Sequence, residues 1–188
     1  MTNPPILRNM AIYSIDGRTP RLGKGCYVDS TTTIIGDVTI GDNVWLGPGS
    51  VVRGDYGTIR IGSYSAVEDN VVIHARPGEA TLIGEHVTLG HSCIVHTGTV
   101  KDWAVIGMGA IVSDFAVVGE WAAVGEGAVV KNRDTIPDRS VAVGVPAKVV
   151  GSVGSEYLDT WTKYKERYNK LCSTYTNSLR QIHYGPSQ

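Results

Sequence analysis

Residues 100–136 read VKDWAV-IGMGAI-VSDFAV-VGEWAA-VGEGAV-VKNRDT-I. An aliphatic residue stands at every sixth position of this stretch, from Val100 to Ile136, and an alanine follows four positions after most of them. A period of six matches neither the 3.6 of an α-helix nor the 2 of a strand in a hairpin sheet. The stretch therefore predicts a solenoid, in which each hexad forms a short strand with one inward aliphatic side chain and then a tight corner.

The same period extends towards the N-terminus and defines the length of the solenoid. Aliphatic residues recur from Val28 to Val95, and the phase slips at two short insertions, within 53–60 and within 74–82. Three hexads close a triangular coil of about 18 residues, and neighbouring coils stack about 4.8 Å apart, the spacing of β-strands. We expect an all-β solenoid over roughly Tyr27–Val150.

A different pattern begins after the last hexad and predicts one long helix. Aromatic and aliphatic residues recur at steps of three and four over about Ser155–Ile182, without an internal glycine or proline. Ser155 is the expected N-cap. Such a helix would span about 40 Å, enough to lie along the solenoid or to cross onto a neighbour. We divide the chain into a solenoid domain, 1–152 with a short lead-in over 1–26, and a C-terminal amphipathic helix and tail, 153–188.

Composition narrows the class of protein. A chain of 188 residues predicts one domain with at most an appendage. Lys and Arg (17) nearly balance Asp and Glu (18), so no basic field favours nucleic acid as a partner. The sequence shows neither a targeting segment nor a membrane span, and we expect a cytoplasmic protein without a membrane partner. The cysteines, Cys26, Cys93 and Cys172, lack CxxC spacing and are expected to be free thiols.

The phase of the repeat brings an arginine and two histidines together. Arg53, His74 and His96 each directly follow an inward aliphatic residue. One coil plus the first insertion separates Arg53 from His74, and one coil plus the second separates His74 from His96. We therefore expect the three side chains to stack on one face of the solenoid. Two imidazoles one coil apart can bind the same tetrahedral metal ion.

A third histidine lies in another phase. His91 belongs to a different face of the triangle, where it stacks over Asp69. It would reach the same metal ion more easily from a neighbouring subunit. His86, near a corner, and His183, at the C-terminal end, are not expected to bind metal. Cys93 occupies a small-residue position and is expected to pack in the core.

These residues resemble the pattern of the γ-class carbonic anhydrases and their close bacterial relatives, over nearly the whole chain. The resemblance rests on Val52-Arg53-Gly54-Asp55, on Glu68-Asp69 followed by His74, and on Gly90-His91-Ser92-Cys93-Ile94-Val95-His96. It implies a left-handed parallel β-helix of hexapeptide repeats and a zinc ion at each interface of a homotrimer. Carried over by motif, His74 and His96 would come from one subunit and His91 from its neighbour.

The resemblance also implies roles for further residues. Arg53 and Asp69 match a salt-bridging pair across the interface, and Asp55 matches a second acid beside the arginine. Glu68 stands where the family commonly has Gln, next to the open coordination position, where it could orient water or exchange its proton. Tyr168 aligns roughly with a tyrosine that hangs over the metal pocket in relatives with a short loop, and plain packing is the equal alternative.

The implied reaction is the reversible hydration of CO2 to bicarbonate, with zinc making hydroxide available near neutral pH. Fe2+ or Co2+ would accept the same imidazoles. Two departures predict that proton export is slow or takes a different route: Tyr56 stands where the more active members carry Glu, and the insertion 75–79 is too short for their acidic shuttle loop. The alternatives are a hexapeptide-repeat acyltransferase that uses acetyl-CoA, a CoA-thioester hydrolase, and a non-catalytic trimer stabilised by metal.

Overall fold

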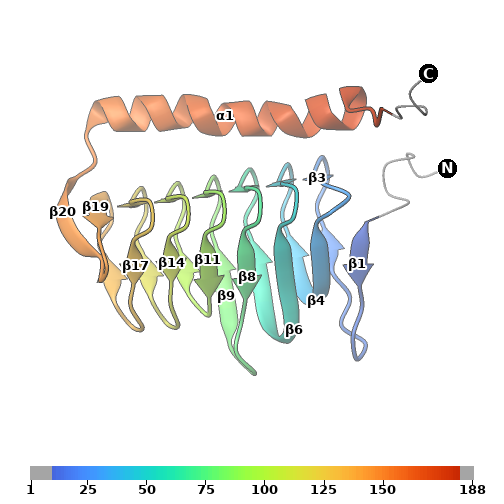
Figure 1. The fold of residues 1–188 in the computed structure, drawn as a ribbon, viewed down its shortest axis with the longest axis horizontal. Coiled ribbons are helices and arrows are strands. Elements are labelled where there is room, and N and C mark those ends of the chain that lie inside the picture. Colours follow the sequence, from blue (N-terminus) through green and yellow to red (C-terminus); the bar gives the residue numbers. More distant parts are fainter. Residues whose placement is uncertain (1–9, 183–188) are drawn as a thin grey trace, which may run out of the picture.

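The computed structural model describes residues 10–182 of the chain. Its strands coil into a left-handed solenoid, and one long helix, α1 (Ser155–Ser178), lies along the outside (Figure 1). The predicted fold class, a parallel β-helix with a C-terminal helix, is confirmed. Within residues 10–182, no helix combines the length and the apolar character needed to cross a membrane.

The first face of the solenoid is an eight-stranded sheet made mostly of two-residue strands. All of its strands pair in parallel except the last, which turns back as an antiparallel edge. In spatial order they are β3 (Tyr27–Val28), β5 (Trp45–Leu46), β7 (Ala66–Val67), β10 (Thr88–Leu89), β13 (Val105–Ile106), β16 (Ala123–Val124), β19 (Ser140–Val143) and β20 (Lys148–Ser152).

The other two faces join into one twelve-stranded sheet because β4 (Thr33–Ile40) and β6 (Val51–Ile61) are long enough to run around a corner. β1 (Ala11–Tyr13) and β2 (Arg21–Leu22) pair with β4. The second face continues from β6 through β8 (Val72–His74), β11 (Ile94–His96), β14 (Ile111–Val112) and β17 (Val129–Val130). The third continues through β9 (Ala80–Ile83), β12 (Thr99–Val100), β15 (Val117–Val118) and β18 (Thr135–Ile136).

The strand register confirms the period read from the sequence. Val105 pairs with Ala123, 18 residues along the chain, whereas Ala66 pairs with Thr88, 22 residues along, because that coil carries an insertion. The residues at the sixth positions point inward and, with the small residues at the corners, form one continuous core. Fully buried members include Val52, Ile73, Leu89, Val95, Ala104, Ile106, Ala110, Val112, Ala116, Val118, Ala122, Ala128 and Val130.

An aromatic ladder occupies one corner of four successive coils. Tyr64, His86, Trp103 and Trp121 all have positive φ angles, of 62°, 53°, 62° and 56°. Their rings stack nearly in parallel, with centroids 5.0, 4.0 and 4.8 Å apart along the series. The corner position predicted for His86 is confirmed, and its ring is used for stacking.

Helix α1 covers the outer side of the first face. Cys172 packs against Tyr27 and Trp45, and all three residues are buried. Tyr168 and Tyr175 meet the Trp45 ring edge-on, with centroid distances of 5.2 and 6.1 Å. The helix therefore lies along its own solenoid, one of the two arrangements that its predicted length allowed.

The helix begins and ends at other residues than the sequence predicted. Gly154 is the N-cap, without a side-chain hydrogen bond, so the prediction of Ser155 as the cap was wrong. The helix ends at Ser178, because the apolar residues that extended the pattern, Leu179 and Ile182, are 53% and 71% exposed and have no surface to pack on. The division into domains 1–152 and 153–188 stays a prediction.

Candidate metal centre

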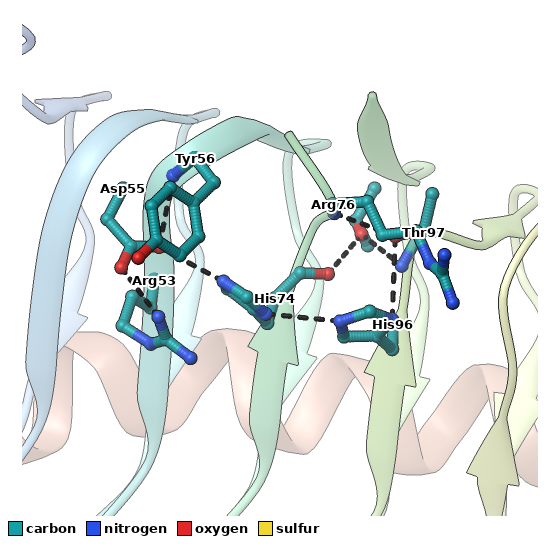
Figure 2. A network of polar contacts seen from close by, with 8 residues as sticks. Arg53, Asp55, Tyr56, His74, Arg76, His96 and Thr97 are labelled. Atoms are coloured by element: carbon teal, nitrogen blue, oxygen red, sulfur yellow. Dashed lines mark hydrogen bonds and ion pairs between the residues drawn. The ribbon is translucent and has the colours of Figure 1, made fainter. Parts of the chain in front are cut away.

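Two histidines end neighbouring strands and face each other. β8 and β11 pair with His74 opposite His96, and Arg53 of β6 lies opposite His74. This register confirms that the three side chains stack one coil apart. The nearest ring nitrogens, Nδ1 of His74 and Nε2 of His96, are 3.1 Å apart (Figure 2).

The spacing of this pair fits a single metal ion. Two nitrogens that each lie 2.0–2.1 Å from a tetrahedral zinc ion are about 3.3 Å apart. The His74 side chain is 14% exposed and the His96 side chain 33% exposed, so both can be reached from outside the solenoid. Imidazole nitrogens accept Zn2+, Fe2+ and Co2+. The donor pair fits a divalent transition metal without selecting among these three.

An ion pair holds His74 from one side. Asp55 accepts a hydrogen bond from Nη1 of Arg53 and lies 3.0 Å from Nε2 of His74 (Figure 2). Burial acts to raise the pKa of the Asp55 carboxyl, but the hydrogen bonds from Arg53 and His74 bring it below its ordinary value. Burial also lowers the pKa of His74, against the opposing effect of Asp55. Asp55 thus lies beside the arginine, as the family resemblance implied.

A second ion pair holds His96, and sequence reasoning missed it. Asp114 accepts a hydrogen bond from Nδ1 of His96 and lies 2.7 Å from Nη2 of Arg76. The hydrogen bond from Arg76, with that from His96, lowers the pKa of Asp114 although burial opposes the shift. Asp114 stands 18 residues after His96, one coil along, and this spacing was the available signal. Asp114 lies in the uninterrupted hexads, where no insertion marks it as different from its neighbours.

The third histidine lies on the first face, away from the pair. His91 follows β10 and its Nδ1 lies 3.4 Å from Asp69, which confirms their predicted stacking. Its Nε2 lies 3.1 Å from Oε2 of Glu68, and its backbone N–H donates to the same oxygen. Within residues 10–182, one chain brings together no set of three His, Cys, Asp or Glu side chains suited to a metal ion. A complete three-histidine site would therefore require a second copy of the chain.

Tyr168 reaches from α1 to Glu68. Burial raises the pKa of the Tyr168 hydroxyl above its ordinary value, and the nearby Glu68 carboxylate adds to this shift. The same ring packs edge-on against Trp45, as the packing alternative expected, and a place over a metal pocket stays a prediction. Glu68 itself is only 7% exposed. The structure thus places Glu68, Tyr168 and His91 in one group on the first face.

A cavity of about 580 Å³ opens beside this group, between α1 and the first face. Glu68 and His91 line one part of it. The remaining walls are largely apolar and include Val105, Ala123, Val141, Tyr157, Trp161 and Tyr164. The cavity is much larger than CO2 requires, and sequence reasoning did not foresee it, because it forms only where the helix docks.

The remaining candidate residues fall as follows. Arg53 and Asp69 lie on different faces and form no ion pair with each other among the described residues. Cys93 is fully buried, and burial raises the pKa of its thiol to about 12, so the prediction that it packs in the core is confirmed. His183 lies outside the described residues.

Comparison with known proteins shows the family. Residues 19–54 match the model of the family described as bacterial transferase hexapeptide (six repeats). A probable carbonic anhydrase of Methanocaldococcus jannaschii is 41% identical over 81% of this chain and 96% of its own length. A carbonic anhydrase of Geobacillus kaustophilus is 35% identical over 84% of this chain and 86% of its own length. This chain belongs to the γ-carbonic anhydrase-like hexapeptide-repeat proteins.

The fold of this γ-carbonic anhydrase-like protein is also shared with transferases. A hexapeptide transferase family protein from Anaplasma phagocytophilum superposes with a TM-score of 0.85, at 32% identity over 90% of this chain and 99% of that chain. One solenoid can carry different reactions, and the fold alone does not choose among them. The reaction must therefore be inferred from the side chains of the candidate site.

Proposed function

We propose that this protein binds a divalent metal ion between the subunits of a homotrimer and catalyses the reversible hydration of CO2 to bicarbonate. The placement of the histidines supports this most strongly. His74 and His96 face each other across 3.1 Å on one face, and His91 stands on another face of the same chain. In a closed ring of three copies, His91 of each subunit would complete the pair of the next, giving three sites per trimer.

The metal would be Zn2+, with Fe2+ or Co2+ as possible occupants of the same ligands. When bound, the ion supplies a Lewis acid that lowers the pKa of water towards 7, which makes hydroxide available to attack CO2. The proposed ligands His74, His96 and His91 bind metal as neutral imidazoles, so they do not offset the positive charge of the ion. The part of the chain is to hold these rings in place and to move protons.

Glu68 is the residue that we assign to water orientation and proton exchange. Its carboxylate lies 3.1 Å from the ring of His91, and Tyr168 lines the same cavity. A buried carboxylate beside a metal ligand can accept a proton from water, and Tyr168 can keep that carboxylate in one orientation. Both residues come from the first face and its helix, so they would serve the site to which their own His91 contributes.

Arg53, Asp55 and Asp69 are assigned to positioning and assembly. Asp55 orients His74, and Arg53 holds Asp55. The side chains of Arg53 and Asp69 remain 38% and 40% exposed. Each can therefore pair with its counterpart on a neighbouring subunit, where a desolvated arginine–carboxylate pair demands close geometry.

The test is metal content per subunit, measured on protein purified without chelator, together with stopped-flow CO2 hydration. We expect about one metal ion per chain, hydration that depends on it, and loss of metal from every site in His91→Ala. His86→Ala is the matched control, because His86 is a stacked corner residue, and it should keep its metal. Metal retained by His91→Ala at one ion per subunit would contradict the ligand assignment.

An acyl-transfer or thioester-hydrolysis reaction is the second candidate. The largely apolar cavity of about 580 Å³ beside Glu68 and His91 favours it, because CO2 does not need such a space. Full metal occupancy with no CO2 hydration, and turnover of an acyl-CoA instead, would support this candidate over the first. Full occupancy without either activity would leave a trimer in which the metal only stabilises the interface.

We also propose a cytoplasmic location. Cys26, Cys93 and Cys172 are all free thiols in the structure. Unpaired cysteines are typical of reducing compartments. Mass spectrometry of the protein alkylated directly in cells should find Cys26, the partly exposed thiol of the three, in the reduced form.

A further inference from the structure

Two ion pairs flank the facing histidines in mirror-image order. On one side Arg53 holds Asp55, and Asp55 holds His74. On the other side Arg76 holds Asp114, and Asp114 holds His96. The first pair belongs to one of the motifs that carry the family resemblance, whereas neither Asp114 nor Arg76 has a role in the function proposed above.

The carboxylates determine which ring nitrogens carry hydrogen. A carboxylate only accepts hydrogen bonds, so Nε2 of His74 donates to Asp55 and Nδ1 of His96 donates to Asp114. In neutral rings the other two nitrogens then carry lone pairs, and these are the atoms that face each other across 3.1 Å. Two lone pairs at this distance repel unless a cation lies between them.

Asp114 therefore prevents the two histidines from satisfying each other. Without it, the hydrogen of His96 could move to Nε2 and donate directly to Nδ1 of His74. That hydrogen bond would occupy both nitrogens that a metal ion needs. With Asp114 in place, the pair is kept ready for a cation in the way that a carboxylate orients a ligating histidine.

The insertion that follows His74 brings Arg76 to Asp114. The Arg76 backbone N–H donates to Oγ1 of Thr97 at 2.9 Å, which anchors the insertion beside the next coil (Figure 2). Its guanidinium lies 2.7 Å from Asp114 while 55% of the side chain stays exposed. The insertion thus holds a carboxylate beside His96.

We propose that Asp114, held by Arg76, is a positioning residue that keeps the Nε2 lone pair of His96 directed at the metal position. This inference rests on the proposed metal centre. It concerns the binding of the ion and not the chemical step. Asp114 lies in the regular hexads and Arg76 in an insertion. Together they form a second supporting ion pair, outside the motif that contains Arg53 and Asp55.

Zinc affinity of the full-length chain tests the proposal. Competition with a chromophoric chelator should show that zinc binds Asp114→Ala about 10–100-fold more weakly than the wild type. Asp114→Asn, whose amide oxygen can still accept from Nδ1, should recover part of the loss. Arg76→Gln, at a largely exposed position that should not affect folding, should weaken zinc binding by a smaller factor.

Asp37→Asn is the matched control. Asp37 also pairs with an arginine on the solenoid, Arg60 at 3.0 Å, but its other partner is Thr58. It should bind zinc like the wild type, and all variants should keep the wild-type mass in light scattering. Equal zinc affinity of wild type, Asp114→Ala and Arg76→Gln would overturn the positioning role alone. A wild type that binds no zinc would overturn the metal centre, and this inference with it.

Discussion

Lys165 belongs to α1, and its titratable amine is buried between the helix and the solenoid. The residue is 3% exposed, and its Nζ donates to Oγ1 of Thr88 at 3.0 Å and to the carbonyl of Ala104 at 3.2 Å. Both acceptors are neutral. Burial lowers the pKa of Lys165 to about 7, and the charge of Glu68 opposes this shift. The amine therefore titrates in the folded chain several units below its value in the unfolded chain.

Because of Lys165, we predict that the free energy of unfolding rises with pH above 7. Between pH 7 and about 10.4 the unfolded chain holds a proton that the folded chain has released, so the free energy of unfolding increases by up to about 1.4 kcal/mol per pH unit. Below pH 7 both states are protonated and the contribution is flat. Lys165→Met should remove the rise. Urea unfolding at pH 7 and pH 9 should show the wild type gaining about 2 kcal/mol more than the variant.

The control for this prediction is Lys101→Met, because the Lys101 side chain is 50% exposed. It should keep the pH dependence of the wild type. The same slope in wild type and Lys165→Met would show that Lys165 does not release its proton in this range.

At the scale of the element, α1 depends on aromatic packing. Tyr27 and Trp45 lie on β3 and β5, at the two outward positions where the first face carries large rings. Tyr175 meets Tyr27 edge-on at 5.1 Å and Trp45 at 6.1 Å. Further along the face the outward residues are small, and there the cavity opens beneath the helix. The C-terminal part of α1 is thus packed tightly, and the N-terminal part covers the cavity.

We predict that Trp45→Ala loosens the helix from the solenoid. Trp45 is 4% exposed, and truncation of a buried tryptophan costs about 3–5 kcal/mol. Amide hydrogen exchange over 155–178 should accelerate, while exchange in the strands of the solenoid should change little. Trp121→Ala is the control, because Trp121 belongs to the corner ladder and not to this cluster. Unchanged exchange of α1 in Trp45→Ala would mean that other contacts hold the helix.

At the scale of the whole molecule, one chain presents different parts of the proposed site on different faces. The second face carries the His74–His96 pair with both flanking ion pairs, and the first face carries His91, Glu68 and Tyr168. Because these parts lie on different faces of the solenoid, they do not meet within the described residues of one subunit. The catalytic unit that we propose is therefore the boundary between two copies.

We predict that Arg53→Ala and Asp69→Ala weaken the trimer. If the two residues pair across the boundary, removing either leaves a charge without its partner, which costs more than the loss of an exposed ion pair. Light scattering at micromolar concentration should give a lower mass for both variants. Arg60→Ala, which removes an ion pair made with Asp37 inside the chain, should keep the mass of the wild type. A full trimer in all three variants would show that the pair is not an anchor.

Much of the site could be read from the sequence because a solenoid converts spacing into position. Counting coils and insertions was enough to place Arg53 beside His74, His74 beside His96, and His91 over Asp69. The same counting could have reached Asp114. Counting could not predict where the Arg76 guanidinium lies, because Arg76 belongs to an insertion outside the six-residue repeat and its side chain is long and flexible.

The sequence by itself determined the coil, the core and the faces on which His74, His91 and His96 lie, since a period of six leaves only one inward position per strand. Tertiary structure alone decided where α1 ends, that Lys165 is buried, and that a cavity opens beside Glu68 and His91. Those features depend on contacts between the helix and solenoid residues some 60 to 130 positions away. No local pattern encodes such contacts, because they form only when two finished surfaces meet.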